Sequence, residues 1–233
     1  MAQGVLVLGP PGTGKSSGIR NLDPAKTFVI CSDRKALPIR GWRNKYKTVY
    51  KEDGKGIDMA KSNYIETNHP ATILSILQYV SDKCPHITTV VIDTLGHVMT
   101  SEFMKNIKIT GFQKFNDLAS DIYNICNKIP DLRKDLFVFV LSHVEAGYDT
   151  AGDKMIKIRT IGKLLDEKIN IESMFTVVFL TSVKESKDNV LEYTFITNNG
   201  NPAKSPFGMF TEREIPNDYN LVMEKVNEYE HAE

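Results

Sequence analysis

The sequence predicts an α/β fold with a mainly parallel central sheet and an antiparallel hairpin near the C-terminus. Short apolar, β-branched runs recur along the chain, and segments with helical periodicity separate most of them. Two further strand-like runs follow each other across one polar turn. The 233 residues, of which 41% are apolar, suffice for one large domain with its own core.

Composition narrows the function classes. The 29 basic and 29 acidic side chains balance, so contacts with nucleic acid or an anionic membrane must come from local patches. The three cysteines lie far apart without a CxxC pair, which predicts reduced core thiols rather than disulfides or a zinc site. The sequence shows no signal peptide and no run of about 18 apolar residues. We therefore expect a cytoplasmic protein without membrane association.

The first strand, Val5–Leu8, leads into a loop with the spacing G-x-x-x-x-G-K-S, which is typical of phosphate-binding loops. The glycines let consecutive backbone N–H groups face one anion, and Lys15 reaches the β- and γ-phosphates of a nucleotide. Ser16 supplies a hydroxyl ligand for Mg²⁺. The predicted nucleotide-binding residues are Gly9, Pro10, Pro11, Gly12, Thr13, Gly14, Lys15, Ser16 and Ser17.

The second strand is expected at Thr27–Cys31, after a helix that Gly18 and the turn at 21–24 keep short. Its carboxyl end carries Asp33, at the sheet edge where open α/β folds place ligand chemistry.

Residues 34–51 combine seven basic side chains with three aromatic ones. Such a mixture can hold phosphates and stack bases. Alternatively, the segment is a solvated excursion whose aromatic residues pin it to the body, with a short edge strand at Thr48–Tyr50. The sequence leaves both interpretations open.

Helical spacing predicts a helix over 70–83, and a β-branched run over 87–94 contains Asp93 near its end. This run has the form of a Walker B strand, whose carboxylate holds a water of the Mg²⁺ shell bound by Ser16. Two helices are expected at 96–108 and 112–129.

A buried strand at Leu136–Leu141 leads to His143. This histidine is either a sensor of the γ-phosphate or a structural residue, and its position alone decides nothing. Residues 146–160 read as a mobile functional loop, and helical spacing returns over 161–171. The C-terminal hairpin is expected from strands at Thr176–Leu180 and Val190–Thr197. We expect an ATPase core over residues 1–210 and an acidic, helical tail over 211–233.

The motif set excludes several nucleotide-binding subclasses. The base reader Asn-Lys-x-Asp of GTPases and the Leu-Ser-Gly-Gly-Gln signature of transporter ATPases are absent. Hexameric remodelling ATPases carry Asp-Glu where this chain has Asp93-Thr94. A small-molecule kinase that uses residues 34–51 as a lid remains an alternative, as does a nucleotide-dependent interaction module with negligible hydrolysis.

Five stretches carry a resemblance to a known family: VLGPPGTGKSS, ALPIRGW, VVIDTLGHVM, FVLSHVE and AKSPFGMF. Together they span nearly the whole chain. The sequence resembles the RecA-like recombination ATPases and, more narrowly, short phage nucleotide-binding proteins of the Sak type, which are linked to single-strand annealing. The resemblance implies a three-layer α/β/α P-loop NTPase that uses ATP and Mg²⁺ and binds single-stranded DNA.

The resemblance also implies roles for individual residues. Asp33 would orient or deprotonate the attacking water, and Asp93 would hold Mg²⁺. His143 would report the γ-phosphate to the loop at 146–160, which would touch single-stranded DNA. Lys204 would complete the site of a neighbouring protomer in a homo-oligomer, as an arginine finger does. A single-stranded-DNA-binding protein is a further expected partner.

Overall fold

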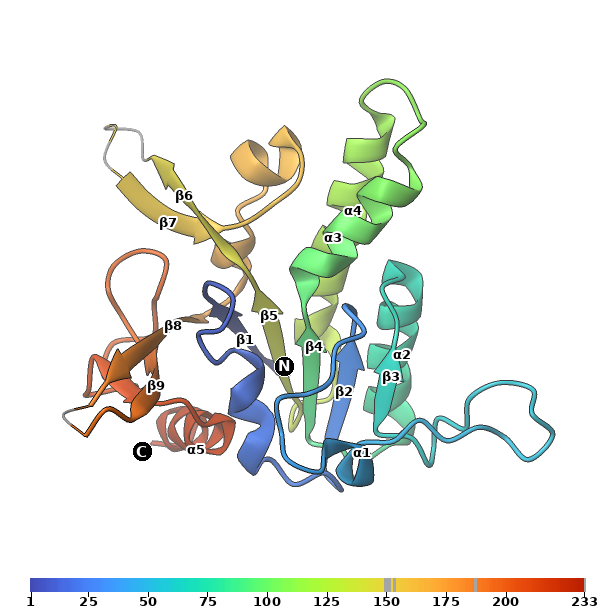
Figure 1. Cartoon of the computed structure of the whole chain (residues 1–233), viewed down its shortest axis with the longest axis horizontal. Helices are drawn as coiled ribbons and strands as arrows, with labels where there is room; N and C mark the ends of the chain where they lie inside the picture. The colour runs from blue at the N-terminus through green and yellow to red at the C-terminus, as the bar shows by residue number, and fades with distance from the viewer. Residues whose placement is uncertain (149–151, 153, 187, 233) are drawn as a thin grey trace.

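A single eight-stranded sheet organises the protein in the computed structural model, which describes residues 1–148, 152, 154–186 and 188–232 (Figure 1). The strand order is β10-β9-β8-β1-β5-β4-β2-β3. Six neighbouring strands of this sheet run parallel, namely β8, β1, β5, β4, β2 and β3, whereas β9 and β10 are antiparallel to their neighbours. The predicted fold class is therefore confirmed. The strands are β1 (Gln3–Leu8), β2 (Thr27–Cys31), β3 (Tyr64–Glu66), β4 (Thr89–Asp93), β5 (Phe137–Ser142), β8 (Val177–Glu185), β9 (Leu191–Ile196) and β10 (Glu214–Pro216).

The four central parallel strands are almost fully buried, because helices cover both faces of the sheet. Their register aligns the carboxyl ends: Leu8 pairs with Ser142, and Cys31 pairs with Asp93. The polar residues that follow these strands therefore meet at one edge of the sheet.

Two apolar clusters, one on each face of the sheet, give three layers. The first cluster holds the residues of three long helices, and the second those of the C-terminal helix and the short turns near the phosphate loop. The three long helices that the spacing predicts are confirmed. No helix in the described part of the chain is long and apolar enough to cross a membrane. The helices are η1 (Ser16–Asn21), α1 (Trp42–Lys45), α2 (Pro70–Lys83), α3 (Leu95–Lys105), α4 (Gln113–Lys128), η2 (Ile129–Asp131) and α5 (Tyr219–Glu230).

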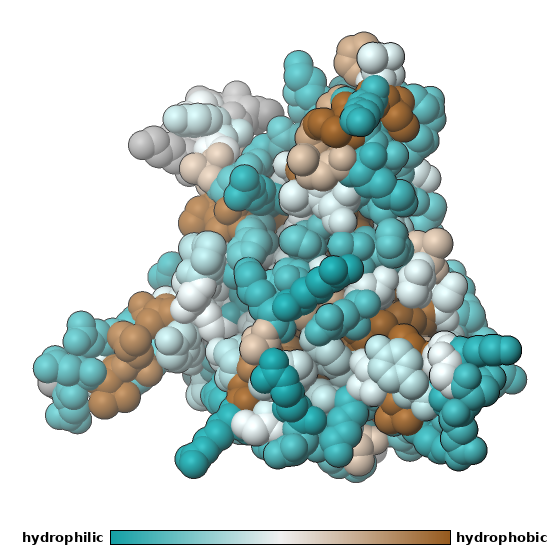
Figure 2. Space-filling view, turned by 45° about the vertical axis from the view of Figure 1, so that its right-hand side comes forward, coloured by the Kyte–Doolittle hydropathy of each residue, from teal (hydrophilic) through white to brown (hydrophobic). Residues whose placement is uncertain are grey.

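Helices α3 and α4 form an arm that projects beyond the sheet (Figure 1). Figure 2 shows apolar residues near the end of this arm, among other apolar areas of the same face. The exposed apolar side chains at the tip are Met104, Ile107, Ile109 and Phe112.

The expected edge strand at Thr48–Tyr50 is wrong, because β3 occupies the edge of the sheet instead. Tyr64 and Ile65 of β3 are buried against β2, whereas Tyr50 is 67% exposed and makes only an isolated bridge to Ile57. The segment lacks the buried apolar side that a paired strand needs. It lies beside β3 through local bonds, such as the one from the Thr48 hydroxyl to the Tyr64 carbonyl at 2.6 Å.

The loop expected at 146–160 is largely an antiparallel ribbon of β6 (Val144–Tyr148) and β7 (Lys154–Ile158). Residues 149–151 and 153 of the expected loop lie outside the described residues. Ile158 anchors the ribbon in the core at 3% exposure. The helix expected over 161–171 is also wrong, since only a π-helical turn η3 (Leu164–Lys168) and a 3₁₀ turn η4 (Ile171–Met174) form there.

The C-terminal hairpin of β8 and β9 is confirmed, and the segment after it packs on the core. Strand β10 extends the sheet, and α5 buries Tyr219, Val222 and Val226. The ring of Tyr219 stacks on Phe139 and Phe195 at centroid distances of 4.1 and 5.6 Å. The acidic residues of α5, which are Glu224, Glu228 and Glu230, thus lie on the outer side of a helix that belongs to the core.

Candidate nucleotide site

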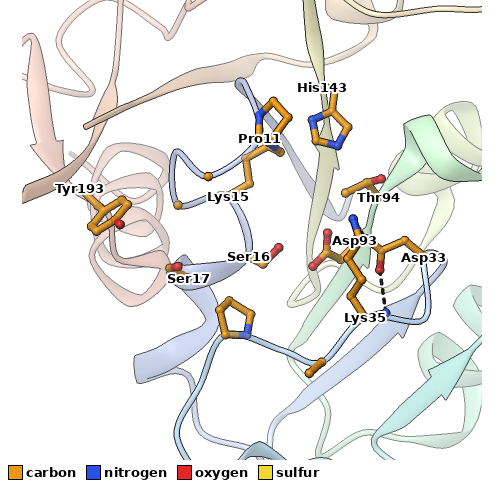
Figure 3. Close-up of a pocket in the computed structure, with 14 residues that line it drawn as sticks. Pro11, Lys15, Ser16, Ser17, Asp33, Lys35, Asp93, Thr94, His143 and Tyr193 are labelled. Carbon is orange, nitrogen blue, oxygen red and sulfur yellow. Dashed lines mark hydrogen bonds and ion pairs between the residues drawn. The ribbon is translucent and has the colours of Figure 1, made fainter. Parts of the chain in front are cut away.

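A cavity of about 390 Å³ lies at the carboxyl ends of the parallel strands, beside the phosphate loop (Figure 3). The strand register brings four of the five residues predicted to act in catalysis to one place, three of them from separate strand ends and Lys15 from the phosphate loop. The cavity is lined by Pro11, Gly12, Gly14, Lys15, Ser16, Ser17, Asp33, Lys35, Ala36, Pro38, Asp93, Thr94, His143 and Tyr193.

Glycine is required at three positions of the phosphate loop. Gly12 and Gly14 have φ angles of +79° and +94°, which residues with a Cβ rarely adopt. A Cβ at Gly9 would lie 1.8 Å from the Thr181 hydroxyl oxygen. The spacing of glycines in the sequence therefore reflects both backbone conformation and close packing.

Lys15 is buried, and its ammonium donates hydrogen bonds to the carbonyls of Gly9 and Pro10, both at 2.8 Å. Burial lowers the pKa of Lys15 to about 8, and the Asp93 carboxylate partly offsets this effect. The ammonium is thus held at the loop, where β- and γ-phosphate oxygens would provide stronger, charged partners.

Side chains from the C-terminal third of the chain support the loop. The hydroxyls of Thr13 and Thr181 lie 2.5 Å apart, and Thr181 also donates to the Leu8 carbonyl at 3.2 Å. The Asn217 amide donates to the Gly14 carbonyl at 2.9 Å, and the Tyr219 hydroxyl donates to the Lys15 carbonyl at 2.7 Å. The predicted site residues omit Thr181, Asn217 and Tyr219, because isolated polar residues far along the chain carry no recognisable pattern.

Asp93 is buried at the end of β4 and faces the loop (Figure 3). Burial raises the pKa of Asp93 to about 6, whereas hydrogen bonding from Ser16 lowers it. Its Oδ1 atom is buried and has no hydrogen-bond partner among the described residues. A buried carboxylate oxygen without a partner, beside a hydroxyl, fits a magnesium ion. Asp93 and Ser16 would hold Mg²⁺, which would neutralise phosphate charge when bound.

Asp33 follows β2 and lies at the same sheet edge as Asp93. Its carboxylate accepts a hydrogen bond from the Lys35 backbone N–H at 3.2 Å and pairs with the Lys35 ammonium at 3.3 Å. The Ser32 hydroxyl accepts a hydrogen bond from the Thr94 N–H at 2.9 Å and donates one to the Thr94 carbonyl at 2.7 Å. These two bonds connect the end of β2 to the end of β4. Lys35, which brings a cation to the cavity, is absent from the predicted site residues.

His143 is the single residue between β5 and β6. Its Nδ1 atom is buried without a partner among the described residues, and burial together with Lys15 lowers the pKa of its imidazole. Its carbonyl accepts the Arg159 N–H at 2.8 Å, at the base of the β6–β7 ribbon. His143 also lines a second cavity of about 330 Å³, next to Glu145 and Arg159. It therefore joins the nucleotide cavity to the ribbon.

Lys204 does not line the nucleotide cavity of its own chain. Its backbone exchanges two hydrogen bonds of 2.8 Å with Val178 of β8. It borders a different cavity of about 430 Å³, together with Tyr148, Asp166 and Glu172. Its action in the site of a neighbouring protomer stays a prediction.

The arrangement defines a class of protein. A phosphate loop follows β1, the buried carboxylate of Asp93 ends β4 in the position expected of a Walker B residue, and β5 lies between these two strands. These features define a P-loop NTPase. The chain belongs to the AAA domain family, whose family model matches residues 1–207. ATP with Mg²⁺ is the ligand typical of this family, and ATP hydrolysis is its typical activity. No curated protein matches the sequence.

Proposed function

We propose that this protein is a Mg²⁺-dependent ATPase that couples hydrolysis to the binding of single-stranded DNA, in support of homologous recombination or strand annealing. One observation carries the coupling: His143 lies in the nucleotide cavity and also connects β5 to the β6–β7 ribbon. A change at the γ-phosphate that displaces His143 would move the base of the ribbon, because Arg159 is bonded to the His143 carbonyl.

Two surfaces support DNA as the partner. An open groove of about 540 Å³ runs along residues 42–50, where the Arg43 guanidinium lies 4.7 Å from the Trp42 ring centroid. Tyr50 leaves 67% of its surface exposed in this groove, and Tyr148 at the end of β6 leaves 69%. Exposed aromatic rings among basic side chains suit the stacking of bases and the binding of phosphates.

The same groove also supports part of the alternative interpretation of residues 34–51. Tyr46 is buried, and Trp42 packs on Tyr64 with ring centroids 5.2 Å apart. These two aromatic residues pin the segment to the body. Tyr50 is thus the aromatic residue of this segment that we expect to stack on a base.

ATP hydrolysis measured with and without single-stranded DNA tests the proposal. We expect DNA to stimulate turnover, and the stimulation to fall steeply with salt because phosphate contacts release counterions. The double variant Tyr50→Ala/Tyr148→Ala should lose the stimulation and keep basal turnover, whereas Tyr123→Ala, at an exposed tyrosine of α4, is the control. The proposed DNA binding would be contradicted if DNA did not stimulate ATP turnover at low salt and the protein also failed to retain labelled DNA in the presence of ATP.

A small-molecule kinase is the second candidate, and the second cavity favours it. This cavity shares Asp33, Thr94 and His143 with the nucleotide cavity and would hold an acceptor beyond the γ-phosphate. The same assay separates the two functions, since an ATPase releases inorganic phosphate whereas a kinase leaves the label on an acceptor. Tight binding of ATP without turnover would instead indicate a nucleotide-dependent interaction module.

A further inference from the structure

The nucleotide cavity has two ends. Asp93, Asp33 and His143 mark the end where the terminal phosphate reacts. Tyr193 lies on the other side of the phosphate loop, near Ser17 (Figure 3). Since the loop lysine reaches the β- and γ-phosphates, the nucleoside must extend toward the end away from Asp93. Among the described residues that line the cavity, Tyr193 is the one Phe, Tyr or Trp.

The sheet explains why the Tyr193 ring lies there. Residues two apart on a strand share a face, so Tyr193 lies on the same side of β9 as Phe195. Phe195 is buried in an aromatic row, at 5.3 Å from Phe179 and 5.6 Å from Tyr219 between centroids. Tyr193 continues this row to the phosphate loop, where a Cβ on Gly14 would lie 2.7 Å from its ring. The ring is half-buried beside the loop, and it still borders the open cavity.

We propose that Tyr193 forms a base-binding subsite, on which the nucleobase of a bound nucleoside triphosphate stacks. A ring fixed by packing loses little conformational freedom when a base stacks on it, so the contact is pre-organised. Every base presents a π-face to such a ring, and the larger purines gain the most contact area.

The subsite binds a base by its face and not by its edge. The nearest side-chain amide, Asn217, donates to the Gly14 carbonyl at 2.9 Å and accepts from Arg20 at 3.2 Å. Both of its polar ends are therefore engaged in holding the loop. The sequence also lacks the Asn-Lys-x-Asp base reader. We therefore expect ATP and GTP to bind with affinities within about fivefold of each other, because their stacking energies are similar.

Binding of two ligands by calorimetry, in the absence of DNA, tests the subsite. The ligands are Mg²⁺-ATP and inorganic tripolyphosphate, which has the phosphates without a base. Tyr193→Leu keeps an apolar side chain against Gly14 and removes the stacking ring. We expect a roughly tenfold higher Kd for ATP and an unchanged Kd for tripolyphosphate, because loss of one stacking contact has this size. Tyr193→Phe should restore ATP binding, and Tyr229→Leu on the outer side of α5 is the matched control.

Three results would contradict the proposed subsite. A parallel loss of ATP and tripolyphosphate binding in Tyr193→Leu would mean that the ring only supports the loop. Unchanged ATP binding would mean that the base lies elsewhere. A preference for ATP over GTP of more than about thirtyfold would show an edge reader, since a good bidentate contact gives discrimination of this order. The inference rests on the nucleotide binding of the family and not on the DNA proposal, so either can fail alone.

Discussion

The hydroxyl of Tyr219 donates a 2.7 Å hydrogen bond to the carbonyl of Lys15, across 204 positions of the sequence. The ring of Tyr219 also packs against η1, which follows the loop, since a Cβ on Gly18 would approach it to 2.7 Å. The C-terminal helix therefore holds the backbone of the phosphate loop, although none of the residues of α5 lines the nucleotide cavity.

Tyr219→Phe should weaken both folding and nucleotide binding. The substitution leaves the Lys15 carbonyl without its donor in a buried place, which lowers the free energy of unfolding by about 1–2 kcal/mol. Urea unfolding and ATP calorimetry measure the two effects. Tyr229→Phe, on the exposed side of the same helix, should change neither. Normal ATP affinity in a destabilised Tyr219→Phe variant would show that the helix supports the fold and not the loop.

The buried, ionised carboxylate of Asp93 should lower the free energy of unfolding at neutral pH when no nucleotide is bound. Its pKa in the folded protein, about 6, lies above the ordinary value of 3.8. The protonated carboxyl group therefore contributes stability that is fully present below pH 3.8 and is lost as the pH rises through 6. Asp93→Asn removes the buried charge and should raise the free energy of unfolding at about pH 7 by up to about 3 kcal/mol. The same variant should lose Mg²⁺-dependent hydrolysis.

Urea unfolding of Asp93→Asn at about pH 5 and about pH 7 checks this prediction, because the gain should shrink at the lower pH. Glu52→Gln, which neutralises an exposed carboxylate, is the control for the loss of one negative charge. A destabilised Asp93→Asn protein at neutral pH would mean that the carboxylate makes favourable contacts in the folded chain.

Lys15 should take up protons when ATP binds. Its pKa of about 8 in the nucleotide-free protein rises beside phosphate anions, which favour the ammonium form. At about pH 8 binding should therefore consume roughly half a proton, and at about pH 6.5 almost none from this group. Calorimetry in buffers with different ionisation enthalpies measures the uptake. Lys15→Arg should abolish it, since arginine stays charged, and Lys15→Ala should abolish turnover.

The strands that build the site could be predicted because parallel, doubly covered strands need continuous apolar runs, such as Val5–Leu8 and the run before Asp93. The edge strand Tyr64–Glu66 could not, because three residues are too few to show a period. The β6–β7 ribbon could not be predicted either, because its stretch of the sequence is rich in glycine and lysine, which is typical of a loop. Tyr193 and Asn217 reach the site only through the order of the strands, which sequence reasoning left unspecified.

Substitution of Lys204 tests whether a neighbouring protomer completes the nucleotide site. The backbone of Lys204 is fixed on Val178 and its side chain lies outside its own nucleotide cavity, so it acts on hydrolysis only if a second copy of the chain receives it. We expect Lys204→Ala to bind ATP normally and to turn over more slowly, because transition-state charge loses a compensating cation. The Asp33→Asn variant should also turn over ATP slowly, but for a separate reason, because it would lose the group that orients the attacking water.

Mixing the two slow variants then decides between action in trans and in cis. In a mixed oligomer some sites combine an intact Asp33 from one protomer with an intact Lys204 from the next, so part of the turnover should return. Lys163→Ala, at the start of the η3 turn, is a matched lysine control that should need no rescue. If the mixture is no faster than the average of its components at concentrations where the protein is oligomeric, Lys204 does not complete a neighbouring site.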